Sequence, residues 1–145
     1  MGQTMAFWYC YYHVIWATQY RKRIITPYLE PLIYQWIKDK SEAMKSEVLA
    51  VSGIEDHIHV AVTIPPTLAV TEWVRHVKGF SAHKVNGVFP DAAELFKWQS
   101  GYGLITVGPK HLPRVIDYVC NQKRHHAENT VIQSLERAGS DDGSY

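Results

Sequence analysis

The chain of 145 residues has only two cysteines, Cys10 and Cys120, which lie far apart among apolar neighbours. This excludes a disulfide-stapled scaffold and the paired-cysteine spacing of a structural zinc site, so we expect two free thiols in a reducing compartment. The sequence also lacks the basic region and apolar stretch of a secretory signal, and no apolar run reaches the roughly 18 residues that a membrane span needs. We therefore expect a cytoplasmic protein that does not contact membranes.

A large excess of charge is absent as well, because the formal net charge is +1. This excludes a histone-like polycation, so any binding to nucleic acid must come from a local basic patch. Hydrophobic residues make up 46% and charged residues 20% of the chain, a composition that excludes a disordered protein. Repeats and low-complexity tracts are also absent. We expect one domain over residues 1–138 and a small, polar, disordered tail over residues 139–145.

The spacing of apolar residues predicts elements in the order β-α-β-β-α-β-α. The predicted strands cover residues 7–20, 47–54, 57–64 and 98–107. Three helices are predicted. The first begins near Thr26-Pro27 and has an apolar face from Leu29 to Ile37, and the second spans residues 68–86. The third runs from about residue 112 into the 125–136 region. All elements but the last match the split βαβ, ferredoxin-like plan of the α+β class, an antiparallel sheet with helices on one face. The C-terminal helix is an addition to this plan.

His57 and His59 are two residues apart on a predicted strand, so their side chains point to the same face of the sheet. Two imidazoles one pleat apart are able to chelate one divalent ion, although a third ligand must come from elsewhere in the chain. An ordinary pair of hydrogen-bonded histidines on a strand gives the same pattern. The pair alone therefore leaves a metal site and a structural role open.

On the last predicted helix, Tyr118, Gln122 and His125 are spaced at i, i+4 and i+7, so they share one helix face. A tyrosine with an ordinary pKa of about 10 is a poor nucleophile at neutral pH. It becomes effective where a metal ion polarises the group under attack, and phosphodiester cleavage through a covalent phosphotyrosine is chemistry of this kind. Gln122 could supply a neutral oxygen to that ion. By spacing alone, a residue at the edge of the core explains Tyr118 as well.

Four stretches carry further information, and they run from the first predicted strand to the last predicted helix. They are Tyr12-His13-Val14-Ile15-Trp16-Ala17-Thr18 with Tyr20-Arg21, Asp56-His57-Ile58-His59-Val60, Trp98-Gln99-Ser100-Gly101-Tyr102-Gly103, and Tyr118-Val119-Cys120-Asn121-Gln122 with His125-His126. In this combination and order the chain resembles the single-tyrosine HUH transposases of small bacterial insertion sequences, and their domesticated relatives associated with repetitive extragenic palindromes. The resemblance spans nearly the whole chain and is more specific than any single motif.

The resemblance implies roles for particular residues. His57, Ile58 and His59 match the family's His-hydrophobic-His motif, and Tyr118 with Gln122 matches its Tyr-x-x-x-Gln unit. By this likeness Tyr118 is the catalytic nucleophile, and His57, His59 and Gln122 are the metal ligands. The ion is implied to be Mg²⁺ or Mn²⁺, and manganese accepts imidazole more readily. The resemblance also implies single-stranded DNA with hairpin ends as substrate, and a homodimer in which each tyrosine helix can complete the partner's histidine pair.

Basic residues that are able to hold a DNA backbone follow the first predicted strand, where Arg21, Lys22 and Arg23 form a run, and Lys78 lies on the second predicted helix. Exposed aromatic residues could add stacking on unpaired bases. Solvated surface charges give the same pattern. We expect the run to contribute more than isolated lysines.

Two other functions remain open at this point. A non-catalytic, RRM-like nucleic-acid-binding module shares the split βαβ plan, but the strand over residues 57–64 carries histidines where such a module needs an aromatic residue. A domesticated nuclease or strand transferase that acts on chromosomal palindromes would have the same site residues as a mobile transposase. The main expectation is a metal-dependent transposase that cleaves and rejoins single-stranded DNA through a 5′-phosphotyrosine.

Overall fold

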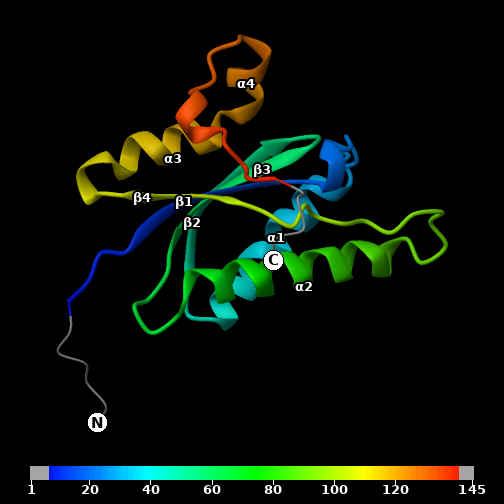
Figure 1. Cartoon of the computed structure of the whole chain (residues 1–145), viewed down its shortest axis with the longest axis horizontal. Coiled ribbons are helices and arrows are strands. Elements are labelled where there is room, and N and C mark those ends of the chain that lie inside the picture. Colours follow the sequence, from blue (N-terminus) through cyan, green and yellow to red (C-terminus); the bar gives the residue numbers. More distant parts are fainter. Residues whose placement is uncertain (1–6, 141–145) are drawn as a thin grey trace.

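The computed structural model describes residues 7–140, which form a four-stranded antiparallel sheet and the helices around it (Figure 1). The strands are β1 (Tyr11–Ala17), β2 (Glu47–Ile54), β3 (His57–Thr63) and β4 (Gly103–Val107), in the spatial order β2-β3-β1-β4. β3 pairs with both β1 and β2, and β1 pairs with β4. This is the order of a split βαβ unit, so the predicted α+β, ferredoxin-like fold is confirmed.

The helices divide between the two faces of the sheet. α1 (Leu29–Ala43) and α2 (Val70–Val88) lie together on one face, whereas α3 (Leu112–Cys120) and α4 (Gln122–Ala127) lie on the other (Figure 1). Short 3₁₀ turns complete the chain: η1 (Gln19–Arg21), η2 (Pro109–His111) and η3 (Gln133–Leu135). Within the described residues, no helix combines the length and apolarity that crossing a bilayer requires.

The main core lies between the sheet and the α1–α2 layer. Alternate strand residues point into it, among them Trp16 of β1 and Ile58 and Val60 of β3, all fully buried. Trp73 of α2 packs edge-on against Trp16 and donates a hydrogen bond to Ser41 of α1 at 3.1 Å. The apolar spacing of both helices predicted this packing, because it places one hydrophobic stripe against the sheet.

Two predicted strands are shorter than expected. The first ends at Ala17 because Tyr20 and Arg21 adopt the left-handed region, with φ of 58° and 52°, which no strand accommodates. The fourth begins at Gly103 rather than Trp98. Trp98 forms only an isolated bridge with Thr18. Gln99 N–H still donates to the Ala17 carbonyl at 2.9 Å, but Gly101 N–H donates to Ser140 rather than to a strand.

The last predicted helix is interrupted at Asn121, where φ and ψ of −111° and 29° separate α3 from α4. After α4 the chain reverses and returns across the sheet face that α3 covers, as the red segment of Figure 1 shows. Gly101 N–H donates to the Ser140 carbonyl at 3.0 Å, which fixes the last described residue beside the start of β4. Residues 141–145 of the predicted disordered tail lie outside the described residues.

Candidate metal and nucleophile site

The sheet face under α3 carries a group of buried histidines. His57 and His59 of β3 are 2% and 0% exposed, and their rings lie 5.1 Å apart on the same face. His13 of β1 stacks against His59, and His13 Nε2 lies 2.8 Å from His59 Nδ1 in a hydrogen bond. Buried histidines are unusual on a strand whose other buried residues are apolar and part of the core, so we infer that this face has a function besides packing.

α3 places Tyr118 directly over these histidines. Val119 anchors the helix against Ala50 of β2 and Ala61 of β3, and the preceding residue then faces the histidine group. The Tyr118 ring centre is 5.9 Å from that of His59. The tyrosine and the pair of histidines, His57 and His59, therefore lie together within one chain.

The tyrosine hydroxyl is enclosed and fully engaged. It donates a hydrogen bond to Glu136 Oε2 and accepts one from the Ile132 backbone N–H at 3.0 Å. The ring stacks on His125 with centroids 4.6 Å apart, so the two residues lie together as predicted, although they belong to the separate helices α3 and α4 rather than to one helix face. Only 3% of Tyr118 is exposed.

Gln122, the predicted third ligand, is the first residue of α4 and is completely buried beside the site. Its Nε2 donates to the Tyr118 carbonyl at 3.2 Å, and its Oε1 lies 3.2 Å from His126 Nε2. The Gln122 amide therefore links the last turn of α3, which contains Tyr118, to His126, a histidine that the sequence spacing did not indicate.

The centre of the cluster is a carboxylate that the sequence did not indicate. Glu136 Oε1 lies 3.2 Å from His57 Nε2 and 3.3 Å from His126 Nε2, and Glu136 Oε2 lies 3.4 Å from His59 Nε2. Ligand atoms from all four side chains lie within 4.8 Å of one another. Three imidazoles and one carboxylate within this span are a ligand set that a divalent transition ion accepts.

Two of these ligand atoms have unmet hydrogen-bonding capacity. His57 Nε2 and His59 Nε2 are buried and form no hydrogen bond, because their contacts with Glu136 have the distance of an ion pair without the required angles. Buried nitrogens without a hydrogen-bond partner are uncommon, and such atoms have a lone pair or proton available for a ligand. Both nitrogens are directed at the same carboxylate, where a cation would satisfy them.

Electrostatics keep the groups of this site in distinct states. Burial by itself raises the pKa of Glu136, but contacts with His57 and His59 hold that pKa far below its usual range. Burial lowers the pKa of His57, yet hydrogen bonding to Asp56 at 2.7 Å and contact with Glu136 give a net increase. Burial and the neighbouring Glu136 raise the pKa of Tyr118 to about 12, so the phenol keeps its proton at neutral pH.

The predicted DNA-binding residues have different surroundings. Arg21 lies 4.0 Å from Asp56, and Lys22 pairs with Glu94 at 2.7 Å. Arg23 lines a surface hollow together with Lys123 and His126, next to the histidine cluster. Lys78 directs its ammonium at the carbonyls of residues 99–101, with bonds of 2.6, 3.3 and 3.0 Å, which ties α2 to the segment before β4.

Sequence reasoning missed His126 and Glu136 as parts of the site. His126 lies in one of the stretches that carry the family resemblance. On one continuous helix, however, His125 and not His126 shares a face with Tyr118. The break at Asn121 turns His126 towards His57, with ring centroids 4.9 Å apart. Glu136 arrives after a chain reversal that has no local sequence signal.

Comparison with known proteins places this chain in a family. A family model of IS200-like transposases matches residues 6–122. The transposase of insertion sequence element IS200 from Salmonella typhimurium is 27% identical over 119 residues, which cover 79% of this chain and 78% of that protein. The ISDra2 transposase of Deinococcus radiodurans is 24% identical over 115 residues, which cover 77% of this chain and 82% of that protein.

Solved structures share the fold. A candidate transposase from Deinococcus radiodurans R1 superposes with a TM-score of 0.66 at 24% identity, covering 84% of this chain and 98% of that chain. A REP-associated tyrosine transposase bound to a REP hairpin superposes with a TM-score of 0.59 at 13% identity, covering 97% of this chain and 93% of that chain. Because the family model spans most of the chain, the expected resemblance is confirmed, and this protein belongs to the family of IS200-like transposases.

Proposed function

We propose that this transposase cleaves and rejoins single-stranded DNA, with the Tyr118 oxygen as nucleophile. The observation that carries this proposal is that the buried Tyr118 hydroxyl is bonded to Glu136, the same carboxylate that His57 and His59 contact. A phenol and a set of metal ligands in one cluster are what phosphodiester transfer requires.

In the proposed step, the Tyr118 oxygen attacks the phosphorus of a scissile phosphodiester, and the bond from phosphorus to the 3′ oxygen breaks. The products are a 5′-phosphotyrosine and a free 3′-hydroxyl, which takes up a proton as it leaves. The Glu136 carboxylate already accepts the hydroxyl hydrogen bond, so it is the nearest acceptor for the phenol proton. Attack by a free 3′-hydroxyl on the phosphotyrosine reverses the step and rejoins a strand.

The residues present fit a divalent ion. His57 and His59, with their two unsatisfied ring nitrogens, would hold it together with Glu136 and His126. Gln122 stays a predicted ligand, and its buried amide lies one contact away, on His126. A bound ion would supply positive charge to the non-bridging phosphate oxygens. Imidazole donors favour Mn²⁺ over Mg²⁺, which prefers an all-oxygen shell.

Access to the phenol requires a local movement. Tyr118 is 3% exposed, and its oxygen is held by Ile132 and Glu136 from the segment after α4. A phosphate can reach that oxygen only when the Ile132 contact opens. We infer that DNA enters from the hollow lined by Arg23, Lys123 and His126, which opens beside the cluster. Lys123 is paired there with Glu30 at 2.5 Å, so Arg23 is the cation most available to a phosphate.

The contacts within one chain support an active site assembled in cis. Tyr118 lies over its own subunit's His59, so no exchange of helices is needed to bring the groups together. The homodimer with a shared site remains a prediction. Mixing a Tyr118→Phe subunit with a subunit in which His57 and His59 are both alanine separates the alternatives: the cis site gives no restored cleavage in proven mixed dimers, whereas a shared site gives some.

The proposed substrate is single-stranded DNA with a hairpin next to the cleavage position. One structural relative is a tyrosine transposase bound to a REP hairpin, and it has the same fold as this chain. A mobile element end and a chromosomal palindrome both present such a hairpin. The site residues are the same for a transposase and for a domesticated strand transferase.

The proposal is tested by incubating the protein with a panel of single-stranded hairpin DNAs and Mn²⁺, followed by denaturing gels. We expect a covalent protein–DNA adduct that is absent from Tyr118→Phe and from the double alanine variant of His57 and His59. Tyr9→Phe, which changes an exposed tyrosine, is the matched control and should form the adduct normally. An adduct that persists in Tyr118→Phe would remove Tyr118 as the nucleophile.

A further inference from the structure

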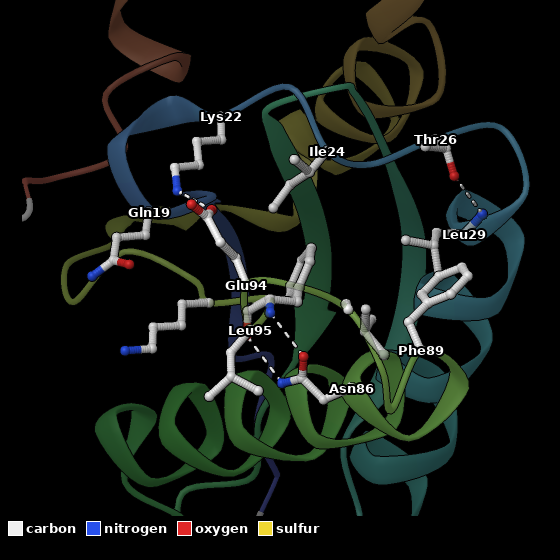
Figure 2. Close-up of a pocket in the computed structure, with 13 residues that line it drawn as sticks. Gln19, Lys22, Ile24, Thr26, Leu29, Asn86, Phe89, Glu94 and Leu95 are labelled. Atoms are coloured by element: carbon white, nitrogen blue, oxygen red, sulfur yellow. Dashed lines mark hydrogen bonds and ion pairs between the residues drawn. The ribbon is translucent and has the colours of Figure 1, made fainter.

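A preformed cavity of about 230 Å³ lies on the side of the molecule where β1 ends, apart from the histidine cluster (Figure 2). One wall comes from the segment after η1, including Ile24 and Leu29, and the other from the end of α2 and the residues before β4, including Phe89 and Leu95. Its volume is below the roughly 300–1,000 Å³ that is typical of pockets for drug-sized molecules. The space therefore suits one flat ring system rather than a larger ligand.

The cavity is held open by specific bonds. The Asn86 side chain of α2 donates to the Phe96 carbonyl at 3.1 Å and accepts from the Phe96 N–H at 2.8 Å, as the paired dashed lines in Figure 2 show. On the other wall, Thr26 Oγ1 accepts the Leu29 N–H at 3.2 Å. These contacts fix both walls from within the described chain, so a ligand would meet a site that is already shaped.

Large apolar side chains are exposed around the cavity. Leu95 is 68% and Phe89 is 45% exposed, although both line it. Tyr28, which is 64% exposed, packs edge-on against Phe89 with ring centroids 6.3 Å apart. A gathering of exposed apolar and aromatic groups beside a cavity marks a binding surface rather than ordinary exterior.

Positive charge and position connect this cavity with the proposed DNA path. Lys97 lines it, and so does Lys22, whose ammonium is paired with Glu94 of the same lining at 2.7 Å (Figure 2). The chain from Lys22 to Pro27 forms a wall between the cavity and the hollow that contains Arg23 and His126. Alternate residues of that wall face the two sides, with Ile24 in the cavity and Ile25 in the hollow. A DNA backbone at the hollow therefore lies one chain thickness from the cavity.

From these observations we propose that the cavity receives one unpaired nucleobase of the DNA strand whose phosphate lies at Tyr118. This inference rests on the proposed function. Stacking in an apolar slot beside a cation is how proteins hold single-stranded bases, and it contributes about 1–3 kcal/mol per base, equivalent to about 5-fold to 150-fold in affinity. A captured base would set the register of the strand, so that one particular phosphate reaches the tyrosine.

The test is an abasic scan in EDTA, where cleavage is stopped, with the hairpin DNA that binds most tightly in the panel. Each unpaired position is made abasic in turn, and affinity is measured by fluorescence anisotropy. The variants are Leu95→Ala, which removes a wall, and Ala92→Phe, which fills the cavity from an exposed lining position. Leu104→Ala, a leucine of β4 that is 40% exposed outside the cavity, is the control.

We expect one abasic position to weaken binding of the unmodified protein and of Leu104→Ala about tenfold. Leu95→Ala and Ala92→Phe should each lose about the same factor with intact DNA, and should lose nothing further from that abasic position. Equal abasic profiles in all four proteins would overturn the proposal. Adduct formation on the same samples in Mn²⁺ separates the two ideas, because a normal adduct with equal profiles rejects only the base pocket. If neither adduct nor binding occurs, the proposed function fails, and this inference fails with it.

Discussion

On β3, Ile58 and Val60 face α1 and α2, whereas His57 and His59 on the same strand face α3 and the returning C-terminal segment. Both sets are almost completely buried. The first set packs against apolar side chains of the main core. The second set contacts the Glu136 carboxylate, which also accepts a hydrogen bond from the Tyr118 hydroxyl. Neighbouring residues thus have opposite tasks, because successive side chains of a strand point to opposite faces. Burial alone therefore does not distinguish residues that stabilise the fold from residues of the site; the atoms that they contact do.

The largest difference between the faces should appear in metal binding and cleavage. His59→Ala removes a direct ligand atom from the cluster, so we expect Mn²⁺ affinity and adduct yield to fall by more than about 100-fold. Ile58→Ala, its neighbour on the other face, should leave both nearly unchanged per folded molecule. Electron paramagnetic resonance titration of Mn²⁺ measures affinity independently of cleavage. Equal losses in the two variants would mean that the faces are not separate in function.

Stability should show the reverse order. Ile58 is fully buried in the main core, so Ile58→Ala should lower the free energy of unfolding by about 2–5 kcal/mol. His59→Ala removes a ring from a polar cluster whose nitrogens are partly unsatisfied, and we expect a smaller loss. Urea unfolding in EDTA measures both. A larger loss in His59→Ala than in Ile58→Ala would contradict this division.

Acid should weaken the histidine face more than the core face. Burial and the neighbouring His59 lower the pKa of His13 from 6.5 to about 3. Below pH 6.5 the unfolded chain binds a proton that folded His13 does not, so this residue's contribution to stability falls as pH drops towards 3, by up to about 1.4 kcal/mol per pH unit. His13→Asn should flatten this part of the pH profile in EDTA. The exposed His111→Asn serves as control, and an equal change in both would contradict the assignment.

The smallest expected effects concern two basic residues outside both faces of β3, Arg23 and Lys78. Arg23→Ala should weaken single-stranded DNA binding a few-fold and reduce the slope of log affinity against log salt by about 0.7, because it removes one phosphate contact. Lys78→Ala should instead lower stability and leave the slope unchanged, since its ammonium binds three backbone carbonyls. Salt titrations of both variants distinguish these roles. A reduced slope in Lys78→Ala would support the sequence-based interpretation of that lysine as a DNA contact.

Local periodicity was enough to predict much of this arrangement. The period of two along β3 placed His57 and His59 on one face, and helical spacing placed Val119 of α3 against the sheet. The order of the strands followed from the split βαβ pattern. The facing of side chains depends on residues close in sequence, where geometry is fixed by the element itself, and the strand order depends on the succession of elements along the chain.

Features that depend on chain reversals were not predictable in this way. Glu136 meets Tyr118 only because the chain turns back after α4, and nothing local in the sequence marks that contact. The late start of β4 has a similar origin. A Cβ at Gly103 would collide with the Arg137 carbonyl, so the returning segment, not strand propensity, determines the backbone there.

The most direct test of the central claim is to digest the covalent adduct formed with hairpin DNA and Mn²⁺ and to locate the attached nucleotide by mass spectrometry. The account predicts one modified peptide, which contains Tyr118 joined to a 5′-phosphate, and a released strand that ends in a 3′-hydroxyl. Attachment at any other residue, or cleavage that leaves no covalent intermediate, would contradict it.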